Sequence, residues 1–186
     1  MPLIMGILAQ GVAAPPVAAG AYDLLETQTL GTAAASVTFT GLGSYTDYKH
    51  LQIRYVAKNT SNAIGTIFTT FNSDTGNNYA THRLFGTGSS VTSDASTSRA
   101  NLYTGNTEDS ASSFAGGIID ILDFASTSKN TTTRTLTGTA QSSSVIGLHS
   151  GVWLNTNAVT TITLTPNENS FDTGSRFSIF GLKAGA

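Results

Sequence analysis

Apolar and polar residues alternate along the stretch His50-Leu-Gln-Ile-Arg-Tyr-Val-Ala-Lys58. Successive side chains of a β-strand point to opposite faces, so this period of two predicts a strand with one buried face. The polar members Gln52 and Arg54 are expected to face outward. The apolar members expected to face a core are Leu51, Ile53, Tyr55 and Ala57.

Similar strand-like segments continue along the rest of the chain, separated by polar turns. The turn Asn72–Asn78 is expected to join the strands 64–71 and 79–85 into a hairpin. Segment 114–124 is dense in apolar residues, as expected for a central strand that is buried on both faces. The stretch 86–98 is rich in Ser and Thr and is assigned no strand. The remaining expected strands are 35–41, 101–104, 131–140, 145–154, 159–165 and 176–183.

This succession of about ten strands without a convincing helix predicts an all-β fold. We expect a β-sandwich, with the jelly roll as the favoured topology. A chain of 186 residues is long enough for one such domain with a substantial core. Charged residues make up only 11% of the chain, against about 25% in an average domain. Thr and Ser take their place, which indicates a neutral, hydroxylated sheet surface.

Net charge and cysteine content exclude several classes of function. The formal net charge is −2, the pI is near 5.8, and the basic residues are scattered singly. A nucleic-acid-binding surface needs clustered Lys and Arg, so nucleic acid is not an expected partner. The chain contains no cysteine, which excludes disulfides, thiolate metal sites and a cysteine nucleophile.

The first 21 residues differ from the rest of the chain because they are apolar and uncharged. The pair Pro15-Pro16 forces extended backbone. A secretory signal would start with positive charge, and a membrane span would need about 20 unbroken apolar residues. A cleaved signal is therefore the weaker interpretation, and no membrane partner is expected. We predict a docking arm at residues 1–21 and a β-sandwich domain at 22–186. The arm residues expected to make contact are Pro2, Leu3, Ile4, Met5, Ile7, Leu8, Val12, Pro15, Pro16 and Val17.

The sequence offers little for a metal site. His50, His82 and His149 lie far apart, and none shows the spacing of a metal-binding motif. The turn Asn72-Ser-Asp-Thr-Gly76 alternates oxygen side chains as a calcium loop does, yet no glutamate follows where an EF-hand needs one. A turn with Gly76 at positive φ is the simpler interpretation. We expect no metal and no cofactor.

Catalytic signatures are equally weak. Asp120 and Asp123 could pass for a glycosidase pair, but strand alternation would point them to opposite faces. Glu108-Asp109 is interpreted as a solvated loop tip. Gly86-Thr-Gly88 lacks the helix that follows a phosphate loop, and no serine lies in a Gly-x-Ser-x-Gly motif. We expect no catalytic residues and no enzymatic activity.

Trp153, the one tryptophan of the chain, leaves two interpretations open. Near the polar Asn155 and Asn157, an exposed indole ring could stack on a sugar. Between Val152 and Leu154 in a strand, the same residue is more typical of a core. Trp153 is therefore the candidate for surface binding, with the core interpretation favoured.

Several blocks of sequence carry a resemblance to a known family. They are Ala35-Ser-Val-Thr-Phe39, Tyr48-Lys-His-Leu-Gln-Ile-Arg54, Phe71-Asn-Ser-Asp-Thr-Gly-Asn-Asn-Tyr79, Gly151-Val-Trp-Leu-Asn-Thr156, Thr161-Ile-Thr-Leu-Thr-Pro166 and Phe177-Ser-Ile-Phe-Gly-Leu-Lys183. With the start Met5-Gly-Ile-Leu8, they make nearly the whole chain similar to a group of virion structural proteins of tailed bacteriophages, found especially in phages of aquatic bacteria. The resemblance implies a non-enzymatic virion component and brings no active-site residues with it.

The residues and the resemblance together lead us to expect a protein located in the virion. The favoured role is a capsid decoration (cement) protein that docks through its apolar N-terminal arm. A tail fibre, a tail adaptor or a receptor (carbohydrate)-binding protein is the alternative. The expected partners are other virion proteins, either the major capsid protein or tail proteins. A homo-oligomer is also expected, with a trimer as one candidate, because several arms docking together bind more tightly than one.

Overall fold

The computed structural model describes residues 21–109, 113–139 and 144–183, so the predicted docking arm lies outside the described residues except for Ala21. Within these ranges the chain forms twelve strands and one short 3-10 helix, Leu42–Ser44. Among the same residues, no helix has the length and apolar character needed to cross a membrane. The strands are β1 (Tyr22–Thr29), β2 (Val37–Phe39), β3 (His50–Ala57), β4 (Gly65–Phe71), β5 (Tyr79–Gly86), β6 (Val91–Arg99), β7 (Leu102–Thr107), β8 (Ala115–Leu122), β9 (Thr131–Gly138), β10 (Ile146–Trp153), β11 (Ile162–Pro166) and β12 (Arg176–Leu182).

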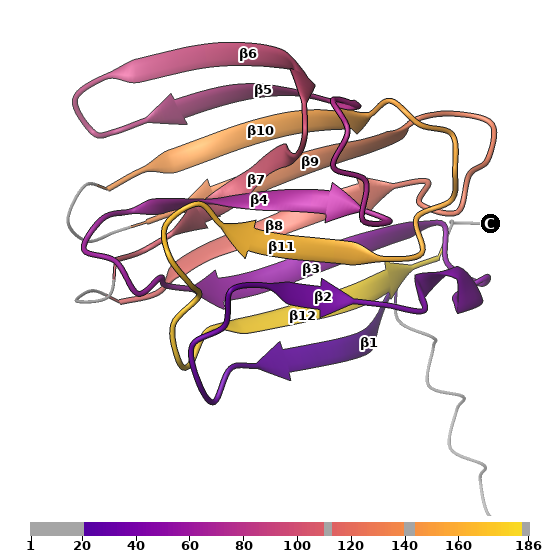
Figure 1. Cartoon of the computed structure of the whole chain (residues 1–186), viewed down its shortest axis with the longest axis horizontal. Helices are drawn as coiled ribbons and strands as arrows, with labels where there is room; N and C mark the ends of the chain where they lie inside the picture. Colours follow the sequence, from indigo (N-terminus) through magenta and orange to yellow (C-terminus); the bar gives the residue numbers. More distant parts are fainter. Residues whose placement is uncertain (1–20, 110–112, 140–143, 184–186) are drawn as a thin grey trace, which may run out of the picture.

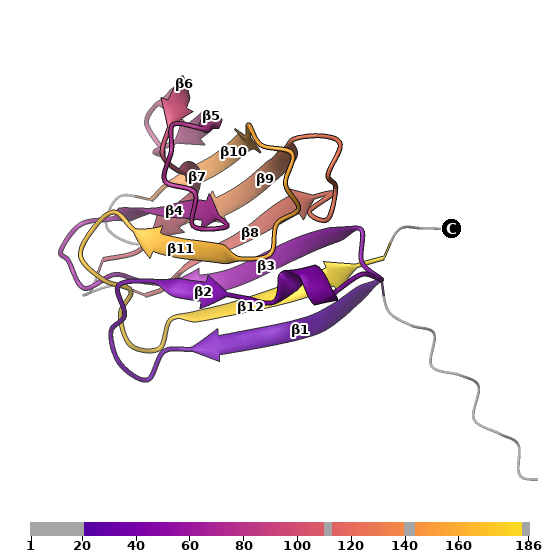
Figure 2. The same ribbon diagram turned by 45° about the vertical axis from the view of Figure 1, so that its right-hand side comes forward.

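Two antiparallel sheets pack face to face, which confirms the predicted β-sandwich (Figure 1). The larger sheet has eight strands in the order β1-β12-β3-β8-β9-β10-β5-β6, and the smaller has four in the order β2-β11-β4-β7. Figure 2 shows that β5 and β6 extend the larger sheet beyond the smaller one. The jelly-roll topology stays a prediction.

The alternation along β3 is confirmed. Leu51, Ile53, Tyr55 and Ala57 are all buried between the sheets, and Arg54 is exposed on the outer face. Gln52 shares that outer face but is buried, because its amide group lies between two polar neighbours. Its Nε2 donates to Asp120 Oδ1 at 2.8 Å, and its Oε1 accepts from Arg54 Nε at 2.7 Å.

The predicted hairpin of 64–71 with 79–85 is wrong. β4 belongs to the four-stranded sheet and β5 to the eight-stranded sheet, so the turn between them carries the chain from one layer to the other. The turn is held by the core beneath it. Trp153 Nε1 donates to Asp74 Oδ2 at 2.7 Å, and the Tyr79 hydroxyl donates to the backbone oxygen of Asp74 at 3.0 Å.

Two strands at the edges of the eight-stranded sheet were not expected from the sequence. β1 pairs with β12 at one edge, and β6 pairs with β5 at the other. Most side chains of β6 are exposed on both faces. A strand that buries neither face shows no apolar alternation, so the sequence pattern does not reveal it.

The core lies between the two sheets and is rich in aromatic rings. Phe71, Tyr79 and Trp153 form one cluster, with the Phe71 and Trp153 ring centroids 5.7 Å apart. Phe171 and Phe177 meet edge to face at 4.8 Å. Such pairs stabilise a fold beyond the area they bury, by about 0.5–1.5 kcal/mol each. The described residues of the β-sandwich therefore form a continuous hydrophobic core among themselves.

Candidate interaction surface on the eight-stranded sheet

Segment 131–140 forms β9, but its polar and apolar faces are inverted relative to β3. The buried side chains of β9 are threonines, and the outward-facing ones include Leu136. The inward position of Thr137 has a clear cause. Its hydroxyl lies 2.7 Å from the buried hydroxyl of Tyr55, and both accept the backbone N–H of Asn106 at 3.1 Å. A buried tyrosine hydroxyl needs a polar partner, so threonine is favoured there over leucine.

β10 repeats this inversion. His149 points inward and is buried, while its neighbours Ile146 and Leu148 point outward and are exposed. The Nδ1 atom of His149 lies 3.3 Å from the backbone oxygen of Tyr103 on β7. Burial lowers the pKa of His149 to about 4, because a charged imidazolium would lose its hydration there. His149 is therefore neutral at pH 7 and belongs to the space between the sheets.

Segment 114–124 forms the central strand β8, as expected, but it is not buried on both faces. Ile119 and Ile121 point into the core, whereas Ile118 is exposed on the outer side. The residue register places Ile118 opposite Leu136, Leu136 opposite Leu148, and Leu148 opposite Leu84. Four aliphatic side chains thus stand in line across β8, β9, β10 and β5.

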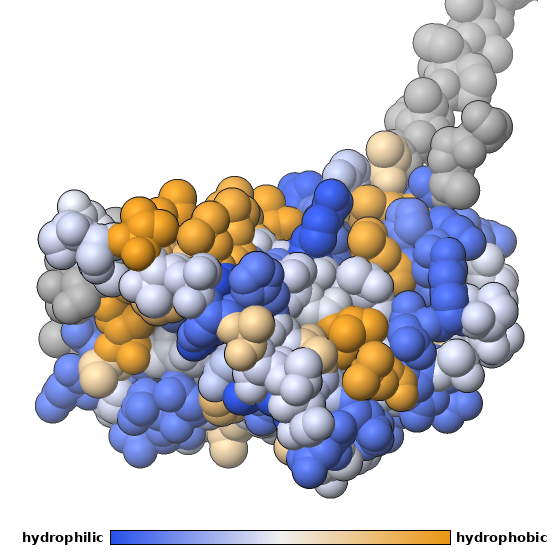
Figure 3. Space-filling view, turned by 90° about the horizontal axis from the view of Figure 1, so that it is seen from above, coloured by the Kyte–Doolittle hydropathy of each residue, from blue (hydrophilic) through white to orange (hydrophobic). Residues whose placement is uncertain are grey.

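We call this line, with Ile146 and Val91 beside it, the apolar strip. Figure 3 shows hydrophobic side chains gathered along one margin of the molecule, at the upper left of the view. The six side chains are exposed by between 39% and 75%, which together leaves on the order of 500 Å² of apolar surface open to water. The largest apolar patch of a typical monomer covers about 300–600 Å² and is often functional. The six residues are Leu84, Val91, Ile118, Leu136, Ile146 and Leu148.

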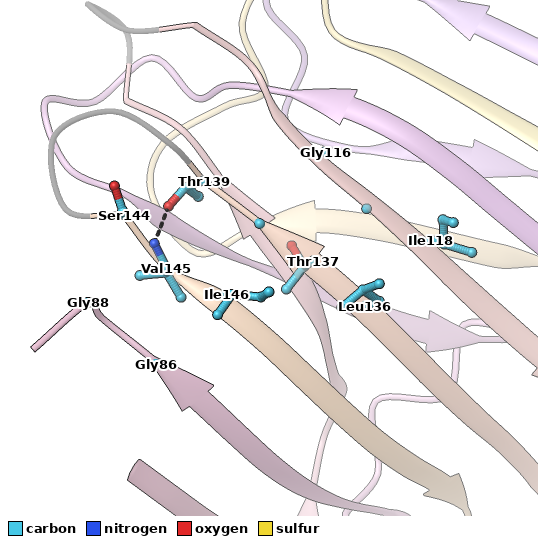
Figure 4. Close-up of a pocket in the computed structure, with 12 residues that line it drawn as sticks. Gly86, Gly88, Gly116, Ile118, Leu136, Thr137, Thr139, Ser144, Val145 and Ile146 are labelled. Atoms are coloured by element: carbon cyan, nitrogen blue, oxygen red, sulfur yellow. Dashed lines mark hydrogen bonds between the residues drawn. The ribbon is translucent and has the colours of Figure 1, made fainter. Parts of the chain in front are cut away.

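A hollow of about 580 Å³ opens beside the strip, at the ends of β8, β9 and β5 (Figure 4). Gly116 lies opposite Gly138, Gly138 opposite Ile146, and Ile146 opposite Gly86, so three glycines line one row of the sheet. Ile146 stands in this row, and Ile118 and Leu136 lie on the adjacent outward row (Figure 4). No charged side chain lines the hollow among the described residues.

The internal packing of the fold does not require the glycines of this row. A Cβ atom added at Gly116 would meet no described atom within 4 Å, and one at Gly138 would meet only the Val145 oxygen, at 3.8 Å. Gly117, the next residue of β8, faces inward, and a Cβ there would collide with the ring of Tyr55. A glycine inside a strand costs stability and often marks a close approach by another molecule or segment. The outward glycines keep the hollow open.

Paired charges border the strip on its next row. Arg134 Nη2 donates to Asp120 Oδ2 at 3.1 Å, and Asp120 also accepts from Gln52. The guanidinium of Arg54 lies over the rings of Tyr22 and Phe180, at 5.0 and 4.9 Å. An apolar centre with a polar rim is the usual anatomy of a protein interface.

The histidines considered for a metal site are separated in the structure. Nδ1 of His50 accepts the backbone N–H of Asp123 at 2.9 Å, His82 is exposed on β5, and His149 is buried. Among the described residues, no group of three or more His, Cys, Asp or Glu side chains is placed to hold a metal ion.

In the turn Asn72–Gly76, which resembles a calcium loop in its alternating oxygen side chains, the carboxylate oxygens of Asp74 already accept hydrogen bonds from the protein. Asp74 accepts from Trp153, from the backbone N–H of Gly76 at 2.9 Å and from the Asn78 side chain. These hydrogen bonds, with that of Trp153 the largest effect, lower the pKa of Asp74. The expectation of a positive φ at Gly76 is wrong, because the left-handed residues are Asn72 and Ser73, with φ of 51° and 58°.

Trp153 does not provide a sugar-binding platform on this surface. It is only 1% exposed, packed against Phe71 and Tyr79, and its polar edge is satisfied by Asp74. The interpretation of Trp153 as a core residue is confirmed. The alternative, that its ring binds a ligand at the surface, is wrong.

The acidic residues occupy separate environments. Asp120 lies on the outer face of β8 with Arg134, whereas Asp123 lies just beyond the strand beside Lys49 and Lys129. The interpretation of Glu108-Asp109 as a solvated tip is wrong, since Glu108 is fully buried and Asp109 nearly so. The Glu108 backbone accepts the N–H of Asn59 at 2.8 Å, which draws this segment against the end of β3.

Comparison of the chain with protein-family models, with curated proteins and with solved structures finds no match. The apolar strip and the glycine row are therefore interpreted from their own geometry. Sequence analysis missed both of them. The sequence held one signal for them. In the segments 131–140 and 145–154 the leucines alternate with residues that can also be buried in a sheet, so either face of these strands could have been the inner one.

Proposed function

We propose that this chain is a non-enzymatic structural protein of a bacteriophage virion, most specifically a capsid decoration protein, and that it assembles through the outer face of the eight-stranded sheet. The observation that carries the proposal is the apolar strip with its glycine-lined hollow. The virion assignment draws further support from the resemblance of nearly the whole sequence to phage structural proteins.

The geometry favours assembly over chemistry. The strip crosses the five neighbouring strands β8, β9, β10, β5 and β6 and is lined by aliphatic side chains, and Arg134 and Asp120 on its border are paired with each other. Active sites instead place a few polar or titratable groups inside a concave pocket. His149, whose pKa is lowered by burial, lies on the opposite, inner face of the same sheet.

Energetics indicate that one copy alone would bind weakly. Covering on the order of 500 Å² of apolar surface gives a gross stabilisation of about 12 kcal/mol. Association costs about 4–15 kcal/mol in lost translational and rotational freedom. The two are comparable, so several copies acting together would make the attachment stable. A homo-oligomer, including a trimer, fits this requirement, with the major capsid protein or tail proteins as further partners.

The alternative is a tail fibre, adaptor or receptor-binding virion protein. The hairpin of β5 and β6 favours this role, because β6 extends the sheet beyond the smaller layer and presents mostly hydroxyl side chains to solvent (Figure 2). Such a surface is suited to hydrogen bonding with a glycan.

Incorporation into particles tests the proposal. The double substitution Leu136→Ser and Leu148→Ser should reduce incorporation into phage particles at least tenfold while leaving the melting temperature nearly unchanged. Thr132→Ser, on the same face of β9 but outside the strip, is the matched control. Counting copies by quantitative mass spectrometry then separates a decoration protein, with hundreds per particle, from a tail protein, with a handful. Full incorporation of the double variant would contradict the proposal, as would glycan cleavage by the purified protein.

A further inference from the structure

We propose that the glycine-lined hollow is occupied by the apolar head of this protein's own N-terminal segment, Leu3-Ile4-Met5-Gly6-Ile7-Leu8. This inference rests on the proposed function in one respect. The proposed function assigns assembly to the outer face of the eight-stranded sheet, and the inference names the segment that covers the hollow on that face. It gives the hollow a peptide occupant rather than a small molecule.

The chemistry of the hollow matches that of the segment. Residues 1–20 carry no charged side chain, and neither does the described lining of the hollow. The volume of about 580 Å³ lies within the range of about 300–1,000 Å³ that is typical of ligand sites. Ile118, Leu136 and Ile146 provide walls for aliphatic side chains. Burying both sets of side chains together removes two apolar surfaces from water at once.

The glycine row explains how an extended segment could approach closely. Gly116 and Gly138 are adjacent on one row of the sheet, and Gly86 lies on the same row beyond Ile146, so no side chain covers the sheet backbone at these three positions. A side chain from the segment could therefore reach the sheet itself. A larger residue in the row would fill the hollow without disturbing the core. Substitution of these glycines can therefore test the occupancy of the hollow separately from folding.

The segment is long enough to reach the hollow. Residue Tyr22 begins β1, three strands from β8 in the sheet order, a lateral distance of about 15 Å. Along the strands, Tyr22 is in the row of His50, whereas Gly116 pairs with Val56, about 20 Å further. The diagonal is about 25 Å, while residues 9–21 can extend to about 40 Å. The head can thus reach the hollow of its own copy or of an adjacent one.

Disulfide trapping tests the occupant directly, because the chain has no native cysteine. The full-length variant Ile4→Cys with Leu136→Cys should crosslink under mild oxidation. The matched control is Ile4→Cys with Thr132→Cys, since Thr132 is exposed on the same face of β9 and lies in the row nearer to the start of β1. An undirected segment would reach Thr132 at least as often as Leu136. We expect crosslinking at Leu136 to be at least tenfold faster.

The crosslinked product identifies the donor copy. An internally closed monomer means that a copy fills its own hollow, and a covalent dimer means that it fills its neighbour's. Either product supports the segment as occupant. Adding Gly138→Val to the Leu136 pair should slow the crosslink at least tenfold, because the valine fills the floor of the hollow. Equal rates at Leu136 and Thr132, or no crosslink at either, would overturn the inference.

Particle incorporation separates this inference from the proposed function. Loss of incorporation in the Leu136→Ser, Leu148→Ser variant without any crosslink at Leu136 would mean that another virion protein covers the strip, so only the inference fails. A fast crosslink at Leu136 in a protein that never enters particles would mean that only the proposed function fails.

Discussion

β3 and β9 lie in the same sheet, one strand apart, and distribute their residues in opposite ways. In β3 the apolar side chains face the core and the polar ones face outward, whereas in β9 threonines face the core and Leu136 faces outward. At Thr137 the difference arises from a polar group that β9 meets on the inner face of its own sheet. The buried hydroxyl of Tyr55 needs a hydrogen-bond partner, and Thr137 supplies it. Leucines left on the outer face of such a strand therefore point to a surface that another segment or molecule covers.

Truncation of one aliphatic side chain on each face should show the largest difference. Ile53→Ala leaves a cavity in the core and should lower the free energy of unfolding by about 2–5 kcal/mol. Leu136→Ala removes an exposed side chain and should change it by about 0.5 kcal/mol or less. Urea denaturation of both variants measures the contrast. Equal losses would mean that Leu136 is as buried as Ile53.

Acid should weaken the inner face through His149. Its pKa in the folded protein is about 4, below the value of about 6.5 in an unfolded chain. The unfolded state then binds more protons between these values, so stability is complete above about pH 6.5 and falls by about 3 kcal/mol as the pH drops to 4.

The variant His149→Gln should flatten this part of the stability curve, measured by urea denaturation from pH 4 to 7. His82→Gln is the control, because His82 lies exposed on the outer face of β5. The lowered pKa values of Asp74, Asp94 and Asp123 act in a more acidic range, since carboxyl groups of unfolded chains titrate near 4. A His149→Gln curve that keeps the full slope would contradict the assignment.

Two consecutive glycines of β8 provide a sharper comparison within one strand. Gly117→Ala forces a methyl group against the buried ring of Tyr55, and such overpacking should cost about 1–3 kcal/mol. Gly116→Ala points into open space and should stabilise the domain by about 0.5 kcal/mol, because alanine loses less backbone entropy than glycine. Thermal unfolding of the two variants should shift in opposite directions. A destabilised Gly116→Ala would mean that the outward glycine is needed by the fold.

Removal of residues 1–20 should have the smallest effect on the folded domain. The core between the sheets is assembled from residues of the described part of the chain, so the melting temperature should change by no more than about 2 °C. Incorporation into particles should nevertheless be lost. Failure of the shortened chain to fold would place the segment in the core instead of on a surface.

Much of the fold could be predicted from local pattern. Strands that bury one apolar face, such as β3 and β12, can be recognised in the sequence because apolar and polar residues alternate along them. β6 could not be predicted, because it buries neither face and its Ser/Thr-rich sequence is equally typical of a loop. The β4–β5 connection was misassigned as a hairpin, since a polar turn has the same local chemistry whether its strands pair or part.

Taken by itself, the sequence determined the all-β class and the contrast in composition between residues 1–21 and the rest of the chain, because both depend on composition or on local periodicity. Only the tertiary structure decided which face of β9 and β10 is inside, that Trp153 and Glu108 are buried, and that Gly86, Gly116 and Gly138 line one outward row. A sequence pattern that repeats every two residues indicates only that a strand has two different faces. Which face is buried depends on the hydroxyl groups, rings and backbone that approach it from distant parts of the chain.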